Sequence, residues 1–205
     1  MNLWFWLCHP RASVARLRYW WWEYRNPDKP WLTPAAVDYL ETHLRPDMTG
    51  LEFGSGRSTV WFARKLRRLT SVEHDPEWFA TISRKLTDAG LGNVDYRLIP
   101  LDHPESAPEQ DVYDPLPQYV AIAADFPDES LDFIVVDGHY RSHCIRQSLG
   151  KLKPGGLLLV DDANLWPDSI PPVPPHWPVV SRSSNGLKIT LIFRKPIQDL
   201  PEVSL

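Results

Sequence analysis

Leu51-Glu52-Phe53-Gly54-Ser55-Gly56-Arg57-Ser58-Thr59 is the stretch from which the architecture of the whole chain can be worked out. It predicts a short apolar strand, a tight turn at two glycines, and an amphipathic helix from Thr59 to Leu69. Because Gly54 and Gly56 carry no Cβ, the backbone can turn sharply there and approach a ligand closely. The turn therefore predicts a cradle for a ligand.

The residues around the turn narrow the choice of ligand. A dinucleotide fingerprint needs a third glycine where this chain has Thr59, and the Gly-Lys-Ser/Thr sequence of a phosphate-binding P-loop is missing. Glu52 stands two places before the first glycine. We expect its negative charge to repel pyrophosphate and to suit a cationic amine.

A second motif follows about twenty residues later, where an apolar run ends in Val72-Glu73-His74-Asp75. In nucleotide-binding α/β units, an acid at the end of the second strand accepts hydrogen bonds from ribose hydroxyls. We assign that role to Glu73. Glu52 could bind an amine, the glycine turn leaves room for a ligand, and Glu73 could bind a ribose. This combination suits S-adenosylmethionine better than a nicotinamide dinucleotide.

These two motifs resemble those of the class I S-adenosylmethionine-dependent methyltransferases. The resemblance implies an α/β protein with a Rossmann-like, doubly wound, mostly parallel sheet that ends in a C-terminal antiparallel hairpin. Asp102 lies at the carboxyl end of a predicted strand over residues 93–101, where it either bonds the adenine amine or belongs to an ordinary loop. The expected cofactor-binding residues are Glu52, Gly54, Ser55, Gly56, Ser58, Glu73, His74, Asp102 and Asp137.

The remaining elements fit this class. Helices are predicted over residues 34–44, 76–89 and 140–152, and strands over 131–137 and 157–162. The run 131–137 is apolar without alternation, as in a parallel strand covered on both faces. Residues 104–117 and the proline-rich residues 163–178 are predicted loops, and residues 179–183 and 187–195 are a predicted hairpin around Asn185-Gly186.

Length, charge and cysteine content limit the classes of function. A chain of 205 residues suits one domain, and a net charge of -4 gives no basic surface for nucleic acid. Cys8 and Cys144 are far apart in the sequence and fit neither a disulfide framework nor a zinc site. We therefore expect a cytoplasmic protein that binds no nucleic acid.

Residues 1–30 differ from the rest in composition and are predicted to form a helical extension before a single domain at residues 31–205. Arginines are mixed there with large apolar residues, among them Trp20, Trp21 and Trp22. Such a helix either packs on the domain or on a second copy of the chain, or lies on a membrane surface, where indole rings and arginines favour the headgroup region. The second role would make the protein peripherally membrane-associated.

Three acids follow the last two predicted parallel strands: Asp137, Asp161 and Asp162. Neighbouring strands deliver their carboxyl ends to one crevice, and three oxygen ligands suit Mg²⁺. Residues 136–141 and 159–162 resemble the metal-binding motifs of Mg²⁺-dependent O-methyltransferases, and the Asp-Asp pair is closer to enzymes acting on sugars of macrolide and aminocoumarin antibiotics than to catechol methyltransferases. Alternatively, these acids cap helices or hold loops.

The predicted reaction is in-line transfer of a methyl group to a hydroxyl of a small molecule, with Asp137 and His139 as catalytic residues. His139 is the candidate base because it follows Asp137 directly and imidazoles titrate near neutrality. His143 and His176 are reserves. Two alternatives stay open: a metal-free N- or C-methyltransferase whose Asp161 and Asp162 bind an amine, and a non-catalytic cofactor-binding scaffold at a membrane.

Overall fold

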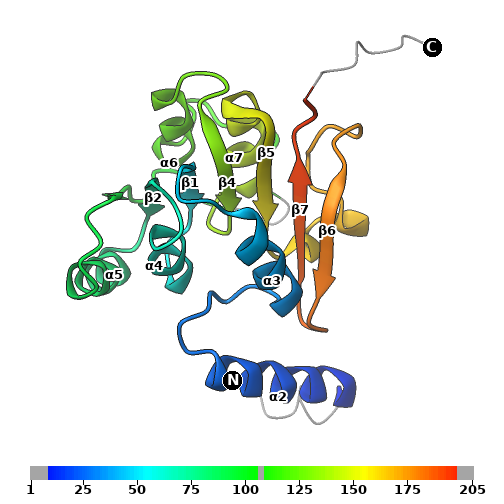
Figure 1. The fold of residues 1–205 in the computed structure, drawn as a ribbon. Coiled ribbons are helices and arrows are strands. Elements are labelled where there is room, and N and C mark those ends of the chain that lie inside the picture. Colours follow the sequence, from blue (N-terminus) through cyan, green and yellow to red (C-terminus); the bar gives the residue numbers. More distant parts are fainter. Residues whose placement is uncertain (1–8, 106–108, 198–205) are drawn as a thin grey trace.

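A computed structural model describes residues 9–105 and 109–197, and these residues form one seven-stranded sheet in the order β3-β2-β1-β4-β5-β7-β6 (Figure 1). The strands are β1 Thr49–Phe53, β2 Arg68–Glu73, β3 Val94–Leu98, β4 Leu131–Val136, β5 Leu152–Val160, β6 Val179–Ser184 and β7 Ile189–Arg194. β1 to β5 run parallel, and β7 is antiparallel to both β5 and β6. The predicted doubly wound sheet with a terminal hairpin is confirmed.

Helices connect the strands and cover both faces of the sheet. The α-helices are α2 Pro10–Arg25, α3 Pro34–His43, α4 Arg57–Ala63, α5 Pro76–Asp88, α6 Gln118–Ala121 and α7 Arg141–Ser148. Single turns of 3-10 helix are η1 Ile122–Asp125, η2 Leu149–Lys151, η3 Ala163–Leu165 and η4 Pro167–Ser169. The last two lie in the proline-rich segment that the sequence predicts as a loop.

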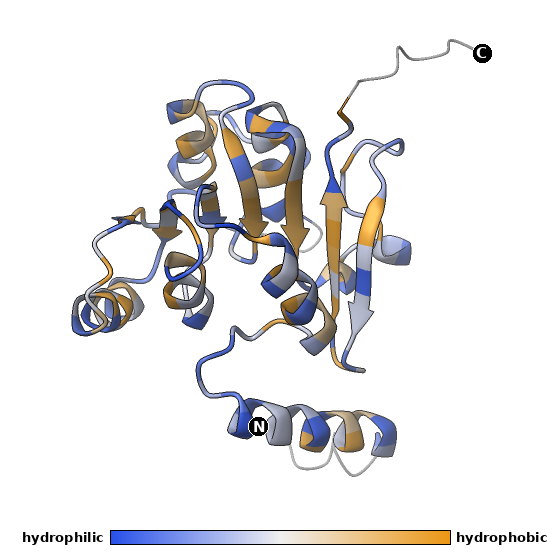
Figure 2. Cartoon of the chain, viewed as in Figure 1, coloured by the Kyte–Doolittle hydropathy of each residue, from blue (hydrophilic) through white to orange (hydrophobic). Residues whose placement is uncertain are grey.

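β4 shows why the central strands are mostly apolar on both faces. Ile134 and Val136 pack into the cluster that includes Tyr140 and Ile145 at α7, whereas Phe133 and Val135 pack into the cluster that includes α3 and α4. Helices therefore cover both faces, as predicted for a strand without alternation. Figure 2 shows the central strands as mainly hydrophobic, with polar residues interrupting the colour.

Several predicted boundaries differ from the structure, two of them by five residues or more. α4 ends at Ala63 rather than at Leu69, because Leu69 belongs to β2, where it is paired with Gly50. The prediction extends the helix because Leu66 and Leu69 continue the apolar spacing of a helix. In the structure, the chain has already left the helix at these residues and leads into β2. β5 begins at Leu152 rather than at residue 157, so the Pro-Gly-Gly sequence lies inside the strand.

The chain order of the sheet reverses at β1, which has β2 on one side and β4 on the other. In open α/β sheets, ligands bind beyond the carboxyl ends of the strands at this switch point. α2 lies apart from the sheet, on the side toward which the arrowheads of β4 and β5 point (Figure 1). No helix in the described part of the chain is both long and apolar enough to cross a lipid bilayer.

Candidate active site

The turns after β1 and β4 touch each other through their backbones. Gly54 has a φ of +93°, and a Cβ there would lie 2.6 Å from Cα of Gly138. A Cβ on Gly138 would lie 2.9 Å from the Gly54 nitrogen and 2.1 Å from the Tyr119 hydroxyl. The two glycines therefore allow the turns after β1 and β4 to pack closely against each other at the switch point. In the predicted cradle, the backbone at Gly54 is not covered by a side chain of its own.

Glu52 lies beneath this turn and is completely buried. Its carboxylate accepts hydrogen bonds from the hydroxyls of Ser58, Thr59 and Ser71 at 2.6 to 2.7 Å. Burial raises the pKa of Glu52 to about 7, against the stabilising effect of these hydroxyls on its charged form. Glu52 ties β1 to α4 and β2 and does not line the cleft described below, contrary to its expected contact with the cofactor amine. Ser58, also predicted to bind the cofactor, does not line the cleft either.

Glu73 ends β2 at the edge of the switch point. It accepts hydrogen bonds from the Ser55 hydroxyl at 2.6 Å and from the backbone nitrogens of His74 and Asp75 at 2.8 and 2.9 Å. The Ser55 hydroxyl also lies 2.6 Å from the Tyr96 hydroxyl. These bonds fix the carboxylate beside the glycine turn, where the sequence places the ribose.

A cleft with a volume of about 950 Å³ opens at this point, within the size range of small-molecule sites. Of the predicted site residues, Gly54, Ser55, Glu73, His74, Asp137 and His139 line it. Gly56 does not, although its nitrogen holds the turn by donating to the Thr59 hydroxyl. The opposite wall comes from α7 and from the residues around η3.

The cleft walls carry more negative than positive groups. The acids are Glu73, Asp75, Glu105, Glu109, Asp111 and Asp137, and the arginines are Arg141 and Arg146. Residues 104–117 are predicted as a loop, but the acids that this loop brings to the cleft are not among the predicted site residues. Their only signal was the acidic composition of the loop. Such a cleft favours a ligand with positive charge.

Asp102 serves the loop rather than the cleft. One of its carboxylate oxygens lies 2.9 Å from Nδ1 of His103, and the other accepts a hydrogen bond from the Gln118 nitrogen at 3.1 Å. These bonds, despite burial, hold the pKa of Asp102 below its usual value. The side chain is hydrogen-bonded to Gln118, the first residue of α6, and is not among the residues lining the cleft. The structure therefore does not place Asp102 at the expected adenine site.

His139 lies on the cleft wall and pairs with Glu105. Nδ1 of His139 contacts one oxygen of the Glu105 carboxylate, whose other oxygen accepts a hydrogen bond from the Tyr140 nitrogen. The His139 ring meets the His74 ring edge-on with centroids 4.1 Å apart. His143 is different, since its two ring nitrogens contact Glu109 and the Asp111 carbonyl, so it is fully engaged as a structural residue.

Asp137, Asp161 and Asp162 converge as the sequence predicts, with one carboxylate oxygen of each within 4.8 Å of the others. Two cations already contact them. Nη2 of Arg141 lies 3.4 Å from both Asp137 and Asp162, while Lys188 forms an ion pair with Asp161. Burial raises the pKa of Asp137 and of Asp161, the charge of Asp161 raising that of Asp137 further.

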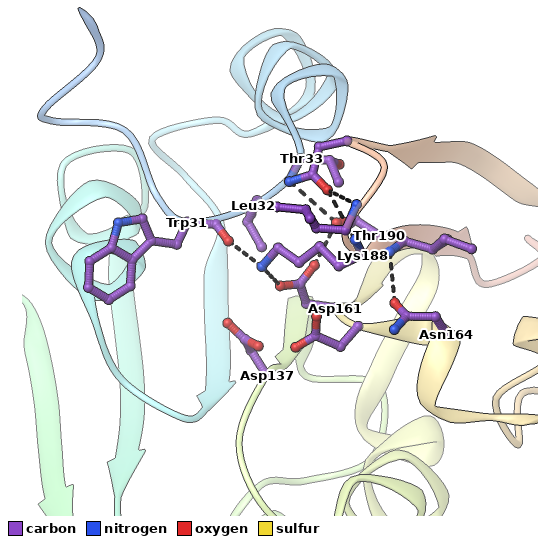
Figure 3. Close-up of polar contacts among 12 residues, drawn as sticks. Trp31, Leu32, Thr33, Asp137, Asp161, Asn164, Lys188 and Thr190 are labelled. Carbon is purple, nitrogen blue, oxygen red and sulfur yellow. Dashed lines mark hydrogen bonds and ion pairs between the residues drawn. The ribbon is translucent and has the colours of Figure 1, made fainter. Parts of the chain in front are cut away.

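Lys188 comes from the turn between β6 and β7 and is not among the predicted site residues. Its ammonium group donates to Asp161 and to the carbonyl of Trp31 (Figure 3). The other oxygen of Asp161 accepts a hydrogen bond from the Thr190 hydroxyl at 2.5 Å. Burial disfavours the charged ammonium, but the charges of Asp161 and Asp137 outweigh this effect and raise the pKa of Lys188.

These contacts test the fit of Mg²⁺. Asp161 is completely buried, and both of its oxygens are already bonded, one of them to a cation. A metal ion at this cluster would meet the positive charges of Lys188 and Arg141 at short range. With Lys188 in place, the three carboxylates therefore do not fit a divalent metal.

The residues do fit S-adenosylmethionine. The bare backbone at Gly54 permits close approach, Glu73 is fixed beside it, and the acidic walls suit a sulfonium and an ammonium group. The same features suit neither pyrophosphate nor another anion. Together with the sheet order, they define a class I S-adenosylmethionine-dependent methyltransferase.

Comparison with known proteins places the chain in a family. Residues 51–163 match the family model described as a methyltransferase domain, and the chain belongs to that family. No curated protein sequence matches the chain.

Solved structures share the fold at low sequence identity. A methyltransferase from Geobacter sulfurreducens superposes with a TM-score of 0.59 at 15% identity, covering 92% of this chain and 90% of that one. The methyltransferase yhhF of Escherichia coli superposes with a TM-score of 0.60 at 16% identity, and the match covers 80% of this chain and 85% of that one. A methyltransferase from Streptococcus mutans, solved in complex with S-adenosylhomocysteine, superposes with a TM-score of 0.58 at 12% identity. The match covers 78% of this chain and 96% of that one.

Proposed function

We propose that the enzyme methylates a hydroxyl oxygen of a small molecule and that His139 removes the hydroxyl proton. The observation that carries this proposal is the pairing of His139 with Glu105 on the cleft wall. An imidazole held by a carboxylate is a common arrangement for a general base.

The pair determines which nitrogen of His139 is available. Because a carboxylate only accepts hydrogen bonds, Glu105 keeps the proton on Nδ1 and leaves the lone pair of Nε2 for the acceptor hydroxyl. Glu105 is itself held by the Tyr140 nitrogen at 3.0 Å, so the ring has a fixed orientation. Asp137 lies on the same wall and can accept a hydrogen bond from the substrate.

The other wall of the cleft binds the cofactor. The backbone of Gly54 and Ser55 lies against the cofactor, and Glu73 accepts hydrogen bonds from the ribose hydroxyls. S-adenosylmethionine supplies an already activated methyl group, so alignment and deprotonation are the main tasks left to the protein.

The experiment compares His139→Gln and Glu105→Gln with the wild type in methyl transfer to a panel of phenols, sugars and amines. We expect His139→Gln to lower kcat by about 10²-fold or more while calorimetry shows unchanged cofactor binding. Loss of Glu105 should lower kcat by about tenfold. His103→Gln is the matched control, since His103 pairs with Asp102 and does not line the cleft. Full turnover by His139→Gln would overturn the proposal.

Amine methylation is a second candidate, favoured by the acidic walls of the cleft. A cationic amine would be attracted by the same charges that suit the cofactor. The acceptor panel separates the two, because an enzyme for amines would modify amines and leave hydroxyl compounds unchanged.

A Mg²⁺-dependent reaction is the alternative for the acid cluster, and it requires Lys188 to leave Asp161. The three carboxylates would then offer oxygen ligands of the kind that Mg²⁺ prefers. Our proposal uses no metal, so activity should persist in EDTA. Activity that disappears in EDTA and returns with Mg²⁺ would instead establish the metal-dependent form.

A further inference from the structure

α2 carries a stripe of large apolar side chains that nothing in the described chain covers. Its members are Val14, Leu17, Trp20, Trp21 and Tyr24, with exposed fractions between 47% and 69%. Their spacing of three and four residues places them along one side of the helix. Tyr19 is buried and donates to the Leu32 carbonyl, so the opposite side faces the domain. Figure 1 shows α2 at the outside of the molecule.

Arginines border the stripe on both sides. Arg11, Arg18 and Arg25 are spaced by seven residues and form a row along one border, while Arg16 lies on the other. The single acid of the helix, Glu23, is 16% exposed in its side chain and pairs with Arg16 at 3.5 Å. The exposed surface of α2 is therefore apolar in the middle and positive at its edges.

The charge of α2 is opposite to that of the rest of the chain. Four arginines and one glutamate give the helix a formal charge of +3, whereas the whole chain carries -4, which leaves -7 for all other residues. A negatively charged surface would attract this helix and repel the remainder. The charge distribution thus selects both a partner and an orientation.

We propose that the stripe of α2 docks on the surface of a lipid bilayer that contains anionic lipids. Tryptophan and tyrosine rings favour the headgroup region, leucine and valine enter the acyl boundary, and the bordering arginines reach lipid phosphates. The helix lies in the plane of the surface, since it is not apolar enough to cross a bilayer.

Two other partners fit these residues less well. A second copy of α2 placed against the stripe would bring the arginines of the two helices close together. The only acid of α2, Glu23, already pairs with Arg16 and is mostly buried, so it could not neutralise the arginines of the second copy. Nucleic acid would use the ring faces for stacking, but Tyr24 already stacks on both Trp20 and Trp21 at 6.0 Å, and Arg25 lies over Trp21.

The experiment measures cosedimentation of the full chain with phosphatidylserine-containing vesicles and with pure phosphatidylcholine vesicles. We expect the wild type to bind the anionic vesicles, with affinity that falls as salt is added. Trp20→Ala/Trp21→Ala and Arg11→Glu/Arg18→Glu should each weaken binding by about tenfold or more. The matched control is Arg84→Glu/Lys85→Glu, the same charge change at exposed positions of α5.

Cofactor binding by calorimetry shows in each case that the variant is folded, because these side chains are exposed and are not among the residues that line the cleft. Equal binding of the wild type to both vesicle types, or none to either, would overturn the proposal. So would a concentration-dependent dimer that Trp20→Ala/Trp21→Ala abolishes, or RNA that binds α2 more tightly than the vesicles do.

Discussion

Glu52 illustrates how a residue next to the binding turn can act without touching a ligand. Its carboxyl group is enclosed by hydroxyls from α4 and β2, and burial raises its pKa from 4.5 to about 7. The folded state therefore holds this proton more tightly than the unfolded state does. Over that pH interval, the folded protein binds more protons, so its stability falls as pH rises.

Replacing Glu52 by Gln should remove this dependence. The difference in unfolding free energy between wild type and Glu52→Gln is expected to decline as pH rises from about 4.5 to about 7, by on the order of 3 kcal/mol at most. Urea unfolding of both proteins between about pH 4 and pH 8 measures the difference. Glu77→Gln, at an exposed position of α5, controls for the change of charge. Parallel curves for wild type and Glu52→Gln would contradict the prediction.

Gly138 is constrained by the backbone of Gly54 as well as by the Tyr119 hydroxyl. An added Cβ would lie 2.9 Å from the Gly54 nitrogen, which cannot move without shifting the binding turn. We expect Gly138→Ala to destabilise the fold by about 2 kcal/mol and to weaken cofactor binding. Thermal unfolding and calorimetry measure the two effects. Gly150→Ala is the control, because its nearest neighbour would be Asp128 at 3.8 Å; comparable losses there would refute the argument.

At the scale of elements, Lys188 joins three parts of the chain. It connects the β6–β7 turn to Asp161 after β5 and to Trp31 in the segment before α3. The same region contains a bond from the Thr33 nitrogen to the Thr190 hydroxyl. The hairpin is therefore fastened to the catalytic edge of the sheet and to the N-terminal segment together.

Lys188→Met should be costly because it leaves Asp161 buried without a cation. Breaking such a pair typically destabilises a protein by about 3–5 kcal/mol, and urea unfolding measures the loss. Lys151→Met breaks an ion pair whose Asp128 side chain is 78% exposed, so we expect less than about 1 kcal/mol. The double variant Asp161→Asn/Lys188→Met should recover part of the loss, and failure to recover any would show that the charge of Asp161 is not the cause.

The elements near the two motifs could be predicted from sequence, because the turn glycines and the apolar strands express local geometry. The convergence of Asp137, Asp161 and Asp162 followed from sheet topology alone. Lys188 and Glu105 could not be predicted, since their partners lie 27 and 34 positions away and are brought close only by the folded loops. The position of Glu52 was missed for a related reason: the hydroxyls that enclose it come from α4 and β2.

At the scale of the whole molecule, α2 is attached by few buried groups. Tyr19 is its one buried residue, and Arg57 contacts the carbonyls of Asn26 and Pro27 in the linker that follows. Removing residues 1–25 should therefore lower the unfolding temperature by only a few degrees, with cooperative unfolding and cofactor binding retained. Calorimetry measures both. Loss of cooperativity would make α2 part of the domain core.

α2 lies on the side of the sheet toward which β4 and β5 point, and Trp31, between α2 and α3, stacks on Trp78 at the cleft. An enzyme held on a lipid surface through this helix would meet amphiphilic acceptors by lateral diffusion in two dimensions. Its water-soluble cofactor would arrive from the bulk. The two reactants would thus reach one catalytic centre from different phases.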